Sequence, residues 1–188
     1  MNPKKATFLL AMPSLQDGIF TKAVVLMANH DEGGALGFII NRTTGADLAE
    51  ALKLLELPGL QKIQVPILLG GPVQTDFFWV IHSPDVTLTT TIATKPQYAI
   101  SSALEIFPLL GTQSCPTIYF AGVGYAGWSA QQLEREIAEG AWWMDEIDPK
   151  LIFPAPPQEK WHEAFKVLGI ETGELVDTTD PFTPPVIN

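Results

Sequence analysis

The sequence predicts a single α+β domain built on a mixed, mostly antiparallel sheet. Three observations lead to this fold class. The chain has 188 residues, which fits one domain better than two. Its composition, 46% hydrophobic and 17% charged, is that of a chain that can bury a core without a metal or a disulfide. Strand-like runs dominate the first half and helical patterns the second, which favours α+β over a regular alternation of strands and helices.

The strand candidates are seven short runs rich in apolar, β-branched or aromatic residues. They cover residues 8–12, 22–28, 36–41, 67–69, 77–82, 88–93 and 117–123. The second and third are separated by the turn-forming sequence Asn-His-Asp-Glu-Gly-Gly at 29–34, so we expect these two strands to form a hairpin. The threonine-rich run 88–93 is expected at a sheet edge.

About four helices are expected on the flanks of this sheet, each with apolar residues three or four positions apart. They are the segment that begins at Asp47, the segment 97–107, the segment that begins at Ser129, and the segment from Pro156 to Gly169. The pattern fades after residue 170. We therefore expect one domain over residues 1–170 and a loosely ordered C-terminal tail over residues 171–188.

Charge and cysteine content exclude several classes of function. The formal net charge is −10, of which −8 belongs to residues 95–188, so direct binding to nucleic acid is not expected. The one cysteine, Cys115, cannot form an intramolecular disulfide, which favours a reducing, cytoplasmic location. The three histidines lack metal-ligand spacing, and no segment approaches the ~20 apolar residues of a membrane span. We expect no metal and no cofactor.

Four ordered blocks of sequence stand out: Ala-Met-Pro-Ser-Leu-Gln-Asp at 11–17, Gly-Ala-Leu-Gly-Phe-Ile-Ile-Asn-Arg at 34–42, Leu-Gly-Gly-Pro-Val-Gln at 69–74 and Gly-Tyr-Ala-Gly-Trp-Ser-Ala-Gln-Gln-Leu-Glu at 124–134. Together they resemble one family of bacterial proteins, the YqgE/AlgH family, and the resemblance covers residues 6–170. It implies a compact α+β domain with a partly barrel-like sheet. It implies no established reaction, and the family's transcriptional-regulator label comes from a genetic association with alginate production.

Glycine-rich segments supply most of the candidate binding residues. The run from Gly122 to Gly127 matches the dinucleotide pattern G-x-G-x-x-G, but the expected helix starts only at Ser129, too late for its amino end to meet a pyrophosphate. The ordinary interpretation is a turn between strand and helix. An alternative is that backbone N–H groups at this turn hold an anion. The candidates are Gly70, Gly71, Gly124, Tyr125, Gly127 and Trp128.

Asn41 and Arg42 complete the candidate ligand site at the end of an expected buried strand. An arginine there can bind a carboxylate or phosphate through two N–H groups, or it can cap a loop through backbone carbonyls. No catalytic residue is assigned. Ser14, Asp76 and His82 could be combined into a hydrolase triad, but no G-x-S-x-G elbow is present.

The sequence thus favours a non-enzymatic cytoplasmic protein that binds a small anionic ligand or a protein partner. Adjacent Trp142 and Trp143 point in opposite directions, so one indole is expected on the surface, where it would mark a partner site. One alternative is an enzyme of unknown class that acts on a small anionic substrate, with Arg42 and His82 in one cleft. A second alternative is a transcriptional regulator that acts indirectly.

Overall fold

The computed structural model describes residues 5–49, 65–110, 112–170 and 172. The strands are β1 (Ala6–Ala11), β2 (Val24–Asp31), β3 (Gly34–Ile39), β4 (Thr43–Asp47), β5 (Pro66–Leu69), β6 (Val73–His82), β7 (Thr91–Lys95), β8 (Tyr98–Ser102), β9 (Tyr119–Ser129) and β10 (Trp142–Ile147). The helices are α2 (Ala103–Ile106), α3 (Gln132–Ala138), α4 (Pro149–Ile152) and α5 (Lys160–Val167), with 3-10 turns at Gly18–Phe20, Phe107–Leu109 and Pro157–Glu159.

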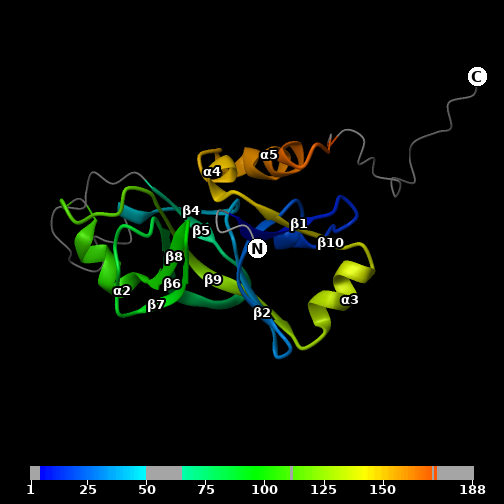
Figure 1. Ribbon diagram of the computed structural model, residues 1–188, viewed down its shortest axis with the longest axis horizontal. Helices are drawn as coiled ribbons and strands as arrows, with labels where there is room; N and C mark the ends of the chain where they lie inside the picture. Colours follow the sequence, from blue (N-terminus) through cyan, green and yellow to red (C-terminus); the bar gives the residue numbers. More distant parts are fainter. Residues whose placement is uncertain (1–4, 50–64, 111, 171, 173–188) are drawn as a thin grey trace, which may run out of the picture.

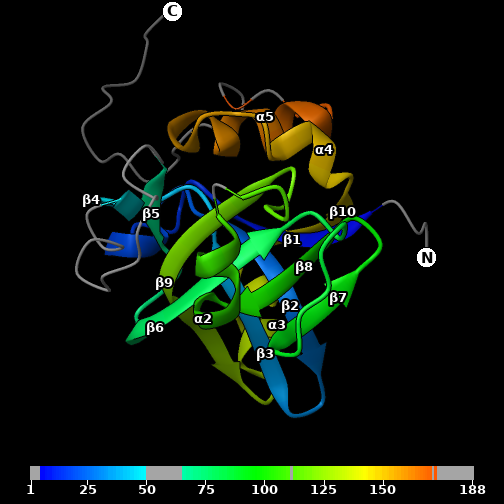
Figure 2. The ribbon, with the colours of Figure 1, turned by 90° about the vertical axis from the view of Figure 1, so that its left-hand side faces the viewer.

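The strands form one curled sheet, as Figures 1 and 2 show. Its order is β10-β1-β2-β3-β9-β6-β8-β7, with the β4–β5 pair joined to β9 through β5. The β5–β9 pair is parallel and the other pairs are antiparallel. The predicted single α+β domain with a mixed, mostly antiparallel sheet is therefore confirmed, and so is its partial barrel shape.

Both faces of the central strands are buried, which explains why the sequence shows continuous apolar runs. Side chains alternate across a strand, and in β1 Phe8 and Leu10 belong to one core cluster while Leu9 and Ala11 belong to another. The predicted hairpin at 29–34 is confirmed, because Asp31 pairs with Gly34 across the turn.

Short helices cover the two faces of the sheet. Figure 1 shows α4 and α5 over one side and α3 on the other. Trp161 and Phe165 of α5 belong to the core cluster of β1 and β2, and the Trp161 indole Nε1 donates to the carbonyl of Ala11 at 2.8 Å. Leu133 of α3 packs with Trp128 and Trp142 in the second cluster.

The helix expected to begin at Ser129 starts at Gln132 instead, after the N-cap residue Gln131, and Ser129 is the last residue of β9. Oε1 of Gln132 accepts hydrogen bonds from both the backbone N–H and the hydroxyl of Ser129, each at 3.0 Å. Glu136, one helical turn later, has a carboxylate that is bonded to other side chains. Its carboxylate accepts from the indoles of Trp128 and Trp142 at 2.9 and 2.8 Å, so it joins α3 to β9 and β10.

Two sequence-based predictions of local structure are wrong. The segment 97–107 begins with β8 and contains only the single turn α2 near its end. The alternation of Tyr98 and Ile100 with Ala99 and Ser101, which pairs β8 with β6, overrides the helical spacing. The expected turn after residue 123 is also absent, because β9 continues without a break from Tyr119 to Ser129.

The expected number of about four flanking helices is not confirmed. Among the described residues, only α3 and α5 extend beyond a single turn. The helix expected from Asp47 falls mostly on residues 50–64, and the expected tail at 171–188 falls almost wholly outside the described residues. The stop at Gly169 is confirmed, since α5 ends at Val167 and Gly169 has a φ of +76°.

A buried lysine ties α5 to the end of α4. Lys160 is 1% exposed, and its ammonium donates to the carbonyls of Ile152, Phe153 and Ala155 at 3.1, 2.7 and 2.5 Å. Burial lowers the pKa of Lys160 to about 8, which leaves it mainly charged at neutral pH. The ammonium therefore supplies a donor to the carbonyls of Phe153 and Ala155 after α4, and a second donor to the Ile152 carbonyl, which also accepts from the N–H of Ala155.

Replacing this ammonium should destabilise the fold. Lys160→Met keeps the apolar stem but removes the donor to the carbonyls of Phe153 and Ala155 and one of two donors to that of Ile152, so the free energy of unfolding should fall by about 3 kcal/mol. Urea unfolding followed by circular dichroism measures the change. Lys166→Met is the matched control, because the Lys166 side chain is 75% exposed and its loss should cost less than about 0.5 kcal/mol. Equal losses in the two variants would contradict this role.

Candidate functional site

Asn41 and Arg42 lie beside a polar groove of about 520 Å³. The groove is formed by the loop before β2, the start of β4 and the beginning of the α5 region. Its lining residues are Thr21, Lys22, Asn41, Arg42, Thr43, Pro157, Gln158, Trp161 and His162. We call it the Arg42 groove. It contains two of the eight candidate ligand residues.

The side chains of Asn41 and Arg42 hold the loop that precedes β2. The Asn41 amide accepts from the N–H of Val24 and donates to the carbonyl of Lys22, both at 2.8 Å. The Arg42 guanidinium donates to the carbonyl of Ile19 at 3.3 Å and to that of Thr21. Loop capping, one of the two roles expected for this arginine, is therefore present.

These contacts fix an unusual backbone conformation at Lys22. Its φ of +53° lies in the left-handed region, which residues other than glycine rarely adopt. The carbonyls of Thr21 and Lys22 are bonded to Arg42 and Asn41, so two side chains hold this conformation in place. Lys22 itself places its ammonium 5.5 Å from the centre of the Trp161 ring, within the groove.

The glycine-rich candidates pack against one another away from the lining of the Arg42 groove. A Cβ on Gly71 would lie 2.1 Å from the backbone carbon of Tyr125, and a Cβ on Gly124 would lie 2.5 Å from the carbonyl oxygen of Gly71. The indole Nε1 of Trp79 donates to the carbonyl of Gly124 at 2.6 Å. We call this contact between residues 70–71 and 122–125 the glycine crossing.

The expected turn between a strand and a helix at residues 122–127 is wrong. Gly124, Tyr125, Gly127 and Trp128 all lie within β9, and α3 begins only at Gln132. Gly70 and Gly71 do approach another segment closely, as expected, and that segment is β9. Trp128 is 7% exposed and bonded to Glu136. A ligand role for these six residues stays a prediction.

A second, apolar groove of about 760 Å³ lies at the far end of β6. Sequence reasoning missed it, because its walls come from β6, β9, the β7–β8 turn and the α4 segment, which are far apart in the chain. Its lining residues are Ile81, His82, Ser83, Pro84, Pro96, Gln97, Ile118, Phe120, Pro149, Lys150, Phe153 and Pro154. We call it the Phe120 groove.

His82 forms the polar part of the wall of the Phe120 groove. Its Nδ1 lies 2.8 Å from the carbonyl oxygen of Ser83, which can only accept, so Nδ1 carries the proton. Nε2 then accepts from the Ser101 hydroxyl at 2.9 Å. Burial lowers the pKa of His82 from 6.5, against smaller opposing effects of the Ser83 carbonyl and the Asp85 charge.

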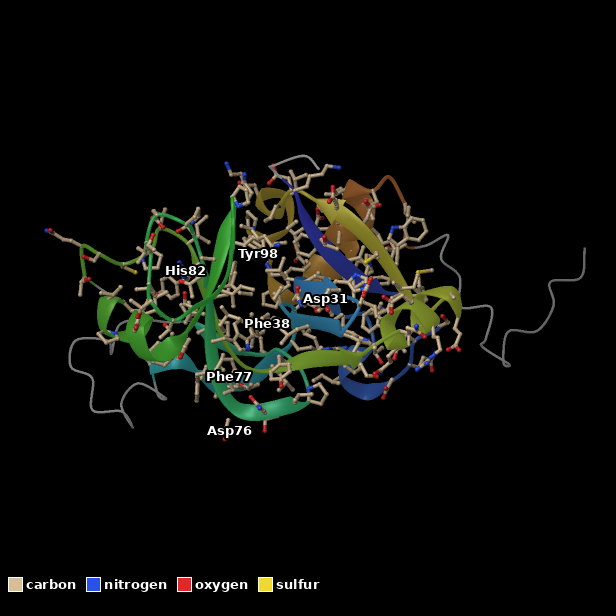
Figure 3. The ribbon with its side chains drawn as sticks, turned by 60° about the horizontal axis from the view of Figure 1, so that its bottom comes forward. Asp31, Phe38, Asp76, Phe77, His82 and Tyr98 are labelled. Atoms are coloured by element: carbon tan, nitrogen blue, oxygen red, sulfur yellow. The ribbon has the colours of Figure 1, made fainter. Side chains whose placement is uncertain are left out.

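This Ser–His contact lacks access for a substrate. Ser101 is fully buried and is not among the residues that line the Phe120 groove. The triad considered from sequence is not assembled either. Asp76 and His82 are six residues apart on β6, which corresponds to about 20 Å, and Figure 3 shows the two side chains well separated. The expected cleft shared by Arg42 and His82 is also wrong, since they line different grooves.

The adjacent tryptophans divide between core and surface. Trp142 is 4% exposed and Trp143 is 42% exposed, which confirms the expectation that one indole reaches the surface. Strand β10 pairs with β1 and stands at one end of the strand order formed by the described residues. A partner role for this edge stays a prediction.

Within the described parts of the chain, no cluster of three or more His, Cys, Asp or Glu side chains is arranged to hold a metal ion. Over the same residues, no helix has the length and apolar character needed to cross a bilayer.

This chain is similar to known proteins over most of its length. A family model described as AlgH-like matches residues 8–173. A UPF0301 protein of Photobacterium profundum is 37% identical over 174 residues, which cover 89% of this chain and 93% of the relative. A UPF0301 protein of Vibrio cholerae is 34% identical over 174 residues, with the same coverage of 89% and 93%.

Two solved structures are similar along most of their length. The solution structure of the AlgH protein from Pseudomonas aeruginosa has a TM-score of 0.74 and 35% identity, and covers 90% of this chain and 91% of its own. The crystal structure of a Corynebacterium diphtheriae protein has a TM-score of 0.69 and 19% identity, covering 88% and 87%, so its likeness concerns the fold alone.

Two of the candidate glycines should respond differently to an added methyl group. Gly71→Ala would drive a Cβ into the backbone of Tyr125 at 2.1 Å, so the free energy of unfolding should fall by more than about 4 kcal/mol, or the protein should not fold. Gly127→Ala is the control, because its Cβ would meet the Tyr125 ring at an ordinary 3.5 Å. Urea unfolding of both variants measures the difference. A strongly destabilised Gly127→Ala would contradict the packing described here.

Acid should destabilise the protein through His82. The unfolded chain takes up a proton near pH 6.5, whereas buried His82 resists protonation, so stability should fall as the pH drops below 6.5 until the folded pKa is passed. An NMR titration of the imidazole should give a midpoint below 6.5. In His82→Gln, the free energy of unfolding measured with urea should fall less steeply between pH 7 and pH 5 than in the unchanged protein, because the buried imidazole is gone. A His82 midpoint at or above 6.5 would contradict the prediction.

Proposed function

The chain belongs to the AlgH-like family, and we propose that it is a non-enzymatic binding protein that holds a small anionic ligand in the Arg42 groove. The observation that carries this proposal is the charge of the lining. Lys22, Arg42 and His162 converge there, and none of the described residues that line the groove is acidic. The chain as a whole has a net charge of −10, so a local basic site stands out from its surroundings.

The groove offers several donors to an anion. Lys22 brings an ammonium group, and the threonines at 21 and 43 add hydroxyls to the lining. Arg42 uses Nε and Nη2 on the backbone carbonyls of Ile19 and Thr21, which leaves the other side of the guanidinium for a ligand oxygen. The constrained loop supports binding, because a backbone that is already fixed loses little entropy when a ligand binds.

The residues that line the Arg42 groove beside its basic side chains favour ligand binding over catalysis. The described part of the groove carries no carboxylate or cysteine beside them, and its histidine, His162, faces Thr172, whose hydroxyl lies 2.9 Å from Nδ1. General acid–base or nucleophilic catalysis needs a nucleophile paired with a base. The hydroxyls of Thr21 and Thr43 have no such partner among the lining residues.

The proposed setting is the cytoplasm, which the single cysteine supports. A regulatory role would then follow from ligand-dependent contact with another protein. The acidic character of the chain supports an indirect action of this kind over direct contact with DNA.

Isothermal titration calorimetry with inorganic phosphate, followed by thermal-shift screening of phosphorylated metabolites, tests the proposal. Lys22→Met should weaken binding about tenfold, because it removes a charge of opposite sign from the groove. Lys95→Met is the matched control, since Lys95 is exposed and does not line the Arg42 groove. Binding should also weaken with added salt.

Three results would contradict the anion site. They are the absence of any stabilising anion in the screen, equal weakening by Lys22→Met and Lys95→Met, and affinity that does not change with salt. Arg42 is left unchanged in these experiments because its bonds to Ile19 and Thr21 support the fold.

A further inference from the structure

The Phe120 groove differs in chemistry from the Arg42 groove and has no role in the proposal above. Its walls carry the apolar side chains of Ile81, Ile118, Phe120 and Phe153. Ile118 is 48% exposed although it is aliphatic, and it lies at this groove. At about 760 Å³, the space is within the range of small-molecule sites.

The walls of the Phe120 groove offer few hydrogen-bond donors. Four of the lining residues, Pro84, Pro96, Pro149 and Pro154, are prolines without a backbone N–H. Both ring nitrogens of His82 are occupied by Ser83 and Ser101. A peptide bound here would leave backbone groups without partners, at a cost for each buried group. An alkyl chain carries no such groups and suits this lining better.

One charged side chain stands among the residues that line the groove. It is Lys150, which is exposed and follows Pro149 at the start of α4. The backbone N–H of Lys150 is bonded to Asp148, but its ammonium has no partner among the described residues. Asp85 lies close to the groove in sequence, but its carboxylate accepts from the hydroxyls of Ser83 and Thr117 at 2.6 and 2.7 Å. The groove is thus apolar with a single free cation.

From these features we propose that the Phe120 groove binds an amphiphilic monocarboxylate with an unbranched alkyl chain, such as a medium- or long-chain fatty acid. The rings of Phe120 and Phe153 pack against each other with centroids 5.2 Å apart, so the alkyl chain lies along the apolar wall that they form with Ile118, and the carboxylate pairs with Lys150. Figure 2 shows α4 above the sheet on the side of β7 and β8, and Lys150 of α4 is one of the residues that line the groove.

Titration calorimetry of the full chain with dodecanoate, below its micellar concentration, tests this site. Affinity should rise about fourfold for each methylene from octanoate to dodecanoate, as expected when each added CH₂ is buried. 1-Dodecanol, which lacks the charge, should bind more weakly than dodecanoate. Lys150→Met should lower the affinity for dodecanoate about tenfold and leave the affinity for 1-dodecanol unchanged.

A matched pair of variants locates the site. Ile118→Glu places a carboxylate in the groove and should reduce dodecanoate affinity by more than about tenfold, because the new charge repels the ligand carboxylate and competes with it for Lys150. Ile92→Glu is the control, since Ile92 is 47% exposed against 48% for Ile118 and does not line the groove. Both variants change exposed side chains, and circular dichroism verifies that both fold.

Several outcomes would overturn the proposal. These are no heat and no NMR shift at His82 with 1 mM dodecanoate, an affinity that does not depend on chain length, or equal losses in Ile118→Glu and Ile92→Glu. Concentration-dependent dimers that Ile118→Glu abolishes would assign the groove to a second copy of the chain. Lys22→Met should leave dodecanoate binding intact, so failure of the anion site and failure of this site are distinguishable.

Discussion

The glycine crossing is the constraint on which the two ends of the sheet depend. Residues 70–71 leave β5 and pass directly over β9. The two backbones lie so close that a Cβ added to Gly71 would overlap the backbone of Tyr125, and one added to Gly124 would overlap the carbonyl of Gly71. The Trp79 ring fills the remaining volume beside Gly70 and Gly122, and its indole donates to Gly124. A parallel strand, β5, is thereby inserted beside a long antiparallel one without opening the core.

The curl of the sheet follows from this packing and determines where grooves can form. Strand β9 pairs with β3 along its end and with β6 along its beginning, so it belongs to both halves of the sheet. The loop before β2 meets the α5 region at one place, and the end of β6 meets α4 at another. The Arg42 groove therefore combines residues up to 141 positions apart in the sequence, from Thr21 to His162, and the Phe120 groove residues up to 73 positions apart, from Ile81 to Pro154.

The two grooves differ because different types of residue close them. Arg42 and Asn41 bind backbone carbonyls and bring Lys22 and its ammonium into a polar space. Prolines and phenylalanines close the other groove, where burial lowers the pKa of His82 and outweighs the opposite effect of its bond to the Ser83 carbonyl. A basic polar site and an apolar site thus coexist on a chain with a net charge of −10.

The sequence by itself determined the fold class, the β2–β3 hairpin and the end of α5 near Gly169, because the hairpin and the helix end depend on neighbours within a few residues. It also identified Arg42 as a residue that holds a loop or a ligand. Only the tertiary structure decided that Tyr98–Ser102 is a strand and that the glycines at 122–127 lie inside β9, since pairing with β6, β3 and β5 overrides local preference. The Phe120 groove could not be foreseen, because its walls meet only after the sheet has curled.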